Sequence, residues 1–136
     1  MKFEYESFKN LPHLMIGSRA FGVNKDNSDY DIVMMFDDVP QEFTKDLDTG
    51  DYSLERYFNL IPPHKAYFLD RRTNLNLIIL TANGDMLIIK EVMAELQQMP
   101  SYYLTNKQDR INLFETGLLH YGFKSYEPKE SNEIPY

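Results

Sequence analysis

The first part of the chain alternates between apolar runs and polar turns. Leu11–Ile16 is a short apolar segment bounded by glycine, a pattern typical of a buried strand. Gly17–Gly22 is expected to turn the chain into a short helix, and Lys25–Ser28 has the composition of a turn. Tyr30–Phe36 is rich in apolar and β-branched residues, so we predict a second buried strand there.

The middle of the chain has a less regular pattern. Gln41–Leu60 contains spaced apolar residues interrupted by a Thr-Gly-Asp sequence, which favours two short helical pieces. Lys65–Leu69 and Asn74–Leu80 have the composition of two strands, joined by the polar turn Asp70–Thr73. The Asn83-Gly84 dipeptide is expected to end the second of these strands.

The last part of the chain is predicted to be helical. Asp85–Gln98 and Gln108–His120 both place apolar residues at helical spacing, and Pro100 follows the first of these segments. We expect a single domain over residues 1–124 and a loosely held tail over 125–136, where proline and charge accumulate. The order of elements predicts an α/β (α+β) fold, a mixed β-sheet with helices packed against it.

Composition narrows the functional classes. The chain has no cysteine, which excludes disulfides, thiolate zinc sites and cysteine nucleophiles. Its net charge of -7 opposes non-specific binding to duplex nucleic acid, because such binding depends on lysine and arginine. The N-terminal residues carry mixed charge, and no apolar run is long enough to cross a bilayer. We therefore expect a cytoplasmic protein with no membrane partner and no long duplex partner.

Two aspartates at the start of the second apolar run are the candidate metal ligands. Asp29 and Asp31 flank Tyr30, and alternation along a strand places both carboxylates on one face. Charges on an otherwise buried strand cost free energy unless a ligand or metal compensates for them. Magnesium suits such a pair, since it takes oxygen ligands and keeps places for water and substrate phosphates.

The Gly17-Ser18 turn is the candidate nucleotide-binding segment. Glycine lets a backbone turn tightly and approach a phosphate closely, and Ser18 adds a hydroxyl. Backbone N–H groups at the start of the following helix can bind anions. Arg19 and Lys25 add positive charge nearby, so both are candidate nucleotide-binding residues.

Residues 14–36, LMIGSRAFGVNKDNSDYDIVMMF, resemble the core motif of the DNA polymerase β-like nucleotidyltransferase superfamily. The resemblance is closest to the minimal nucleotidyltransferases, in which an apolar strand, a Gly-Ser-Arg-Ala turn and a Ser-Asp-x-Asp strand follow one another. The residues that fall on that pattern are Gly17, Ser18, Arg19, Ala20, Gly22, Ser28, Asp29 and Asp31.

The resemblance implies a nucleotidyltransferase fold and a magnesium-dependent transfer of a nucleoside monophosphate from a nucleoside triphosphate to an acceptor hydroxyl. By that resemblance, Gly17 and Ser18 hold the triphosphate, Arg19 assists, and Asp29 and Asp31 hold Mg²⁺ or Mn²⁺. The acceptor is left open between a protein hydroxyl, a tRNA end and a small molecule. A partner protein or a second copy of the chain is expected to complete so small a site, and one half of a toxin–antitoxin pair is a third interpretation.

One position departs from the pattern. Active members usually carry a third carboxylate on a later strand, and Asn76 occupies the position that we align with it. Asparagine can offer a metal its carbonyl oxygen but cannot act as a base. The protein could use another acid such as Asp70 or Glu55, work slowly, or bind nucleotide or a partner protein without catalysis. Short nucleotidyltransferase-like proteins of bacteriophages are similar in this strand, so the change could be a subfamily trait.

Three tyrosines and a histidine have less specific interpretations. Tyr102, Tyr103 and Tyr121 could stack on a base, but packing in the core or at an interface is the favoured prediction. His13 is expected to be a packed or edge residue rather than a metal ligand.

Overall fold

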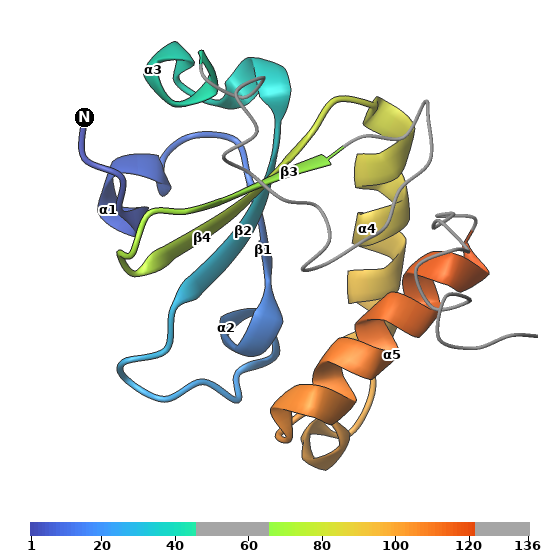
Figure 1. Cartoon of the computed structure of the whole chain (residues 1–136). Helices are drawn as coiled ribbons and strands as arrows, with labels where there is room; N and C mark the ends of the chain where they lie inside the picture. Colours follow the sequence, from blue (N-terminus) through green and yellow to red (C-terminus); the bar gives the residue numbers. More distant parts are fainter. Residues whose placement is uncertain (46–65, 122–136) are drawn as a thin grey trace, which may run out of the picture.

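The structure is a computed structural model that describes residues 1–45 and 66–121, and Figure 1 shows a sheet with helices on both faces. Within these residues, β1 (Leu14–Ile16), β2 (Tyr30–Met35), β3 (Ala66–Asp70) and β4 (Leu75–Leu80) form one sheet in the order β1-β2-β4-β3. The central pair, β2 and β4, is parallel, and each outer strand is antiparallel to its neighbour. The predicted mixed sheet with helices is therefore confirmed.

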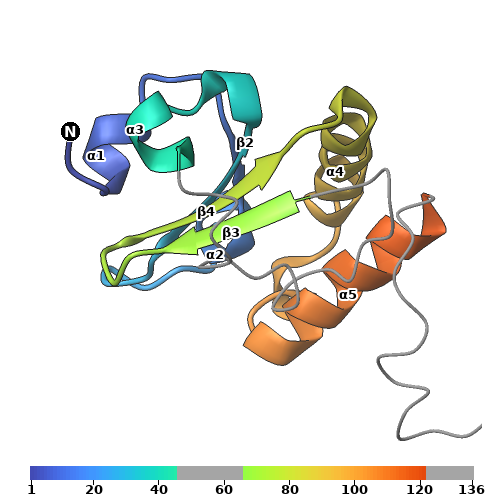
Figure 2. The ribbon, with the colours of Figure 1, turned by 45° about the horizontal axis from the view of Figure 1, so that its top comes forward.

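One face of the sheet is covered by the short helices α1 (Tyr5–Phe8) and α3 (Gln41–Thr44), as Figure 2 shows. Phe3, Phe8 and Phe43 pack there with their ring centroids 5.4 to 5.6 Å apart. They lie against the even-numbered apolar residues of β2 and the odd-numbered residues of β4. Alternation along the two central strands thus builds the first core.

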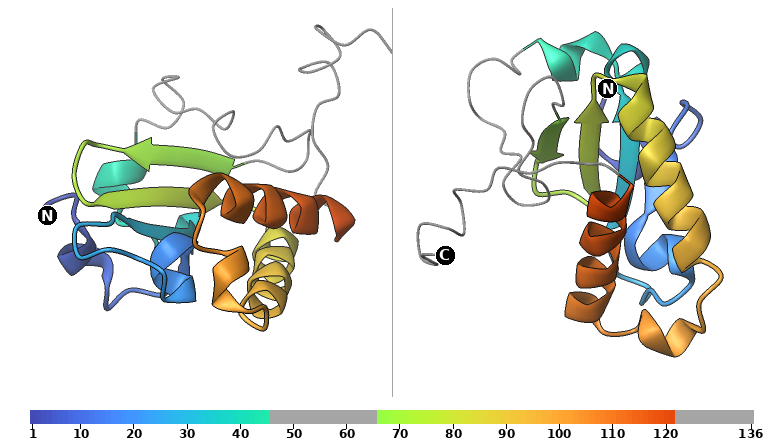
Figure 3. Two further views of the ribbon diagram at one scale, coloured as in Figure 1. Left: turned by 90° about the horizontal axis from the view of Figure 1, so that it is seen from below. Right: turned by 90° about the vertical axis from the view of Figure 1, so that its right-hand side faces the viewer.

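The opposite face is covered by α2 (Gly17–Phe21), α4 (Asn83–Leu96) and α5 (Lys107–His120), and Figure 3 shows α4 and α5 beside each other there. Val33 and Ile78 from the sheet pack on this face with the buried stripe of α4. Because helices cover both faces, the central strands are apolar on both sides. A Cβ on Gly117 would lie 2.8 Å from Val92 Cγ1, so a small residue allows α4 and α5 to approach closely.

Several predicted boundaries shift for local reasons. The first strand begins at Leu14 rather than Leu11, because the Leu11 N–H donates to Phe8 and the Leu11 carbonyl oxygen lies 2.7 Å from His13 Nδ1. Those contacts hold His13 half-buried directly before β1, as expected for a packed residue. Asn83 was expected to end a strand, but it opens α4 instead.

The remaining differences concern the end of the second strand, an unpredicted helix, and residues that the structure does not describe. Phe36 leaves the second strand and begins the 3₁₀ turn η1 (Phe36–Asp38). Helix α1 was not predicted from the sequence. Residues 46–65 and 122–136, which include the second helical piece, Glu55, the domain boundary at 124 and the predicted tail, lie outside the described residues.

Across residues 1–45 and 66–121, no helix has the length and apolar character needed to span a membrane.

Candidate functional site

The site begins where β1 passes directly into α2 at Gly17. Gly17 has φ +74°, a left-handed conformation that glycine adopts readily, and its neighbour Ile16 pairs with Asp31 on β2. A Cβ at position 17 would overlap the Oδ2 atom of Asp31. Two reasons therefore require glycine at position 17: the backbone conformation, and the room that the Asp31 carboxylate needs.

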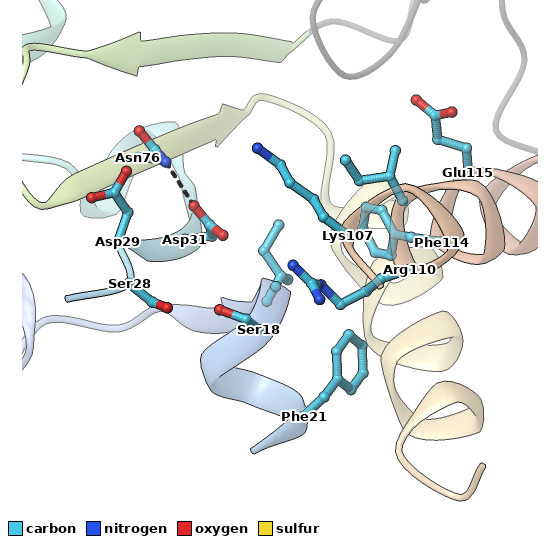
Figure 4. A pocket seen from close by; sticks show the side chains of 13 residues that line it. Ser18, Phe21, Ser28, Asp29, Asp31, Asn76, Lys107, Arg110, Phe114 and Glu115 are labelled. Atoms are coloured by element: carbon cyan, nitrogen blue, oxygen red, sulfur yellow. Dashed lines mark hydrogen bonds between the residues drawn. The ribbon is translucent and has the colours of Figure 1, made fainter. Parts of the chain in front are cut away.

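Asp31 is held from its other side by Asn76. The two residues are direct partners on the parallel strands β2 and β4, so their side chains project from the same face. Asn76 Nδ2 donates a hydrogen bond of 2.8 Å to Asp31 Oδ1, drawn as the dashed line in Figure 4. Asn76 thus lies beside the acidic pair, and the position offers a hydrogen-bond donor where a carboxylate was expected.

The surroundings of Asp31 disfavour its charged form. Burial raises the pKa of this carboxyl above its ordinary value, and the neighbouring Asp29 carboxylate raises it further. The hydrogen bond from Asn76 and the positive charges of Arg110 and Lys107 lower the same pKa, but the net direction is upward. A cation placed beside Asp29 and Asp31 would relieve this cost, which is the electrostatic argument for a ligand at the site.

These groups line a cavity of about 270 Å³ between the sheet, α2 and α5. Ser18, Ser28, Asp29, Asp31 and Asn76 form its polar wall. Helix α5 contributes Lys107 and Arg110, two cations that the sequence did not predict as site residues. The remaining lining residues are Ile16, Gly17, Phe21, Ile111, Phe114 and Glu115. The cavity thus combines carboxylates, cations, two serine hydroxyls and an apolar side.

Arg19 and Lys25 are not among the residues lining this cavity. Arg19 Nε and Nη2 donate to the Ser28 carbonyl oxygen at 3.1 and 2.8 Å, and Nη2 also donates to the Asp26 carbonyl oxygen at 3.1 Å. The guanidinium lies 3.9 Å over the Tyr30 ring. Arg19 therefore stabilises the loop that positions Ser28 and Asp29 at the cavity. A phosphate contact by Arg19 or Lys25 stays a prediction.

Replacing Arg19 by methionine is expected to lower the free energy of unfolding by about 2 kcal/mol, because hydrogen bonds from a charged group and a cation–π contact are lost. Chemical denaturation followed by far-UV circular dichroism would measure the change. The matched control is Lys25→Met in the same loop, since Lys25 bonds to Ser28 Oγ through its backbone N–H. Equal stability of the two variants would contradict this stabilising role of Arg19.

Asp70 does not supply the missing third acid. It pairs with Asn76 across β3 and β4, so it lies on the same face, but it is not a lining residue of the cavity. Its Oδ1 accepts a hydrogen bond of 3.0 Å from the Arg72 N–H. In the part of the chain that the structure describes, no three acidic or histidine side chains form a group that could hold a metal ion.

The donor set of the site fits one magnesium ion held by two carboxylates. Magnesium is often bound by one or two carboxylates with water and substrate phosphates completing its shell. Asp29 and Asp31 meet that description, and Asp31 keeps acceptor capacity beyond its bond to Asn76. The set does not fit a centre built on three carboxylates, because Asn76 takes the third position.

The exposed tyrosines correct one expectation. Tyr102 and Tyr103, in the 3₁₀ turn η3 (Ser101–Tyr103), are 68% and 47% exposed, so core packing is the wrong prediction for both. Their rings lie against each other with centroids 4.3 Å apart. Tyr121 is also exposed. Packing of these residues at an interface stays a prediction.

Comparison with known proteins found no match among protein-family models, curated proteins or solved structures.

Proposed function

We propose that this protein is a magnesium-dependent nucleotidyltransferase with a small version of the nucleotidyltransferase fold. The observation that carries the proposal is the cavity in which the Gly17-Ser18 turn, the carboxylates of Asp29 and Asp31, and two cations of α5 face one another. Such a cavity can receive the phosphates of a nucleoside triphosphate on one side and carboxylate-bound magnesium on the other.

The residues of the cavity divide the work of binding. Ser18 and the Gly17 backbone bind phosphate oxygens at the start of α2, and Lys107 and Arg110 bind them from α5. Phe21 and Phe114 form an apolar side on which the base or ribose of the nucleotide packs. Phosphates and base are thus held in one orientation relative to the acidic pair.

Asp29 and Asp31 would hold the magnesium or manganese ion, which supplies charge neutralisation on the phosphates when it is bound. In the transfer, the oxygen of the acceptor hydroxyl forms a bond to the α-phosphorus. The bond from that phosphorus to the bridging oxygen breaks, and pyrophosphate leaves. Asn76 cannot accept the hydroxyl proton, so the proton would pass to a water molecule.

The acceptor hydroxyl would come from a protein, a tRNA end or a small molecule. The described residues form no separate acceptor-binding domain, so a partner protein or a second copy of the chain would present the acceptor. The net charge of -7 disfavours a long duplex as the partner. A reducing, cytoplasmic setting suits a chain without cysteine.

A second candidate function is nucleotide binding without transfer. Asn76 favours it, because its amide occupies the third-acid position and donates to Asp31. Such a protein would bind a nucleotide or a partner protein through the same cavity.

The test is incubation with each α-³²P-labelled nucleoside triphosphate and Mg²⁺, with candidate acceptors and with the chain alone. We expect label transfer by the wild type and loss of at least about 100-fold in Asp29→Asn/Asp31→Asn, which keeps side-chain shape and removes the charge. Asp37→Asn/Asp38→Asn is the matched control, because this exposed pair follows the same strand outside the cavity.

Three outcomes separate the candidates. Transfer that depends on Asp29 and Asp31 supports the enzyme. Nucleotide binding without transfer to any acceptor favours the binding protein. No nucleotide binding at all contradicts both the enzyme and the nucleotide-binding protein, and leaves only binding of a partner protein through the cavity.

A further inference from the structure

Helix α5 brings two positive charges to the wall of the cavity that faces the acidic pair. Figure 4 shows Lys107 extending from α5 into the space in front of Asp31 and Asn76, with the Arg110 guanidinium turned toward Ser18. Both charges act on Asp31, since both lower the pKa of its carboxyl. Lys107 and Arg110 lie three residues apart on the helix, so one face of α5 presents them together.

Arg110 is fixed in this position by the turn before α5. Its Nη1 donates a hydrogen bond of 2.8 Å to the Leu104 carbonyl oxygen, and Leu104 is buried. Nη1 also donates to the Thr105 carbonyl oxygen at 3.5 Å, so both bonds come from one of the three guanidinium nitrogens. An arginine held in this way loses little freedom when it binds a phosphate, which strengthens binding.

The charges explain why a third carboxylate can be absent. Three carboxylates would repel a triphosphate unless metal ions neutralised them. Here the uncharged Asn76 replaces one acid, and Lys107 and Arg110 balance Asp29 and Asp31. Glu115 also lines the cavity and adds a third negative charge, but Figure 4 shows it apart from the acidic pair.

We propose that the cavity binds a nucleoside triphosphate without a divalent metal. Lys107 and Arg110 supply the positive charge that a metal ion held by a third carboxylate would otherwise supply. The inference rests on the proposed function, since it concerns the same cavity and the same ligand. It separates binding, which the two α5 cations support, from transfer, which also needs the acidic pair and magnesium.

The test is isothermal titration calorimetry of the full chain with ATP, GTP, CTP and UTP, in EDTA and in Mg²⁺. We expect at least one of them to bind in EDTA, with an affinity within about tenfold of that in Mg²⁺. Lys107→Met is expected to weaken binding in EDTA by about tenfold or more, because a charge-assisted contact to phosphate is lost. Inorganic tripolyphosphate should compete in EDTA, since phosphates carry the recognition.

Two variants control for charge and folding. Lys90→Met removes an exposed lysine of α4 that does not line the cavity, and it should bind like the wild type. Lys107→Arg keeps the positive charge and should retain binding in EDTA. If only the aliphatic stem of Lys107 mattered, keeping the charge would not be needed for binding. Circular dichroism verifies that each variant is folded.

The outcomes distinguish metal-free binding from the proposed nucleotidyltransferase function. Binding in Mg²⁺ but not in EDTA overturns the inference and leaves the nucleotidyltransferase proposal intact. Unchanged binding in EDTA by Lys107→Met also overturns it. Absence of binding in both conditions overturns the inference together with the proposed function.

Discussion

Gly17→Ala is expected to lower the free energy of unfolding by about 3 kcal/mol and to abolish nucleotide binding. An alanine at φ +74° costs about 1–2 kcal/mol, because its Cβ crowds the backbone in the left-handed region. The same Cβ would overlap Asp31 Oδ2, and relief of such crowding costs about 1–3 kcal/mol more. The chain has no tryptophan, so denaturation is followed by far-UV circular dichroism.

Gly22 provides the matched control for this substitution. It has φ +71°, nearly the value at Gly17, but a Cβ there would meet nothing within 4 Å. Gly22→Ala should therefore show the conformational cost alone, about 1–2 kcal/mol. Adding Asp31→Ala to Gly17→Ala should recover part of the lost stability, because the overlap disappears. If Gly17→Ala and Gly22→Ala lowered the free energy of unfolding equally, the absence of a side chain at Gly17 would not be what makes room for the Asp31 carboxylate.

The fold was predictable where local pattern and burial agree. Tyr30–Phe36 and Asn74–Leu80 were expected to be strands because they are apolar on successive residues, and helices do cover both faces of β2 and β4. The sequence did not reveal that residues 11–13 lie outside the strand, because the contact between His13 and the Leu11 carbonyl is not a hydrophobic pattern. Strand order and direction also depend on long-range pairing that periodicity does not encode.

The candidate site was predictable only where its residues are close in sequence or in register. Gly17, Ser18, Asp29 and Asp31 belong to one short motif, and Asn76 was found only by aligning its strand with the third acid of the family that the motif resembles. The register of β2 and β4 then pairs it with Asp31. Lys107 and Arg110 were missed because a helical pattern does not say which cavity the polar side of α5 will face. Arg19 illustrates a different limit, since an arginine that binds backbone carbonyls looks the same in a sequence as one that binds phosphate.

Asn76→Asp is expected to lower the free energy of unfolding by about 2–3 kcal/mol at neutral pH without metal. The substitution replaces the Asn76 Nδ2 donor, which lies 2.8 Å from Asp31 Oδ1, by a second carboxylate. A hydrogen bond to a charged group is lost and a like-charge contact replaces it. Mg²⁺ should restore about 2.7 kcal/mol at a concentration of 100 times its dissociation constant, because three carboxylates now face one ion.

The pH dependence of this variant has a defined sign. In the wild type, the pKa of Asp31 is raised above its ordinary value of 3.8, mainly by burial. The folded state therefore keeps this proton longer than the unfolded chain, so the stabilisation is present below the ordinary pKa and is lost as the pH rises through the raised one. A carboxylate introduced at position 76 beside Asp31 enlarges this dependence of stability on pH. Asn76→Asp should therefore gain stability relative to the wild type as the pH falls toward 4.

Asn74→Asp is the control for added charge. Asn74 is exposed, and its Oδ1 accepts a hydrogen bond of 3.1 Å from the Tyr5 N–H, a role that aspartate can also fill. This variant should change the free energy of unfolding by less than about 0.5 kcal/mol and show no Mg²⁺ dependence. Denaturation of both variants between pH 4 and 8, with EDTA or Mg²⁺, provides the comparison. If Asn76→Asp were as stable as Asn74→Asp at pH 7 in EDTA, the Asn76 amide would not be the group that stabilises the half-buried Asp31 carboxylate.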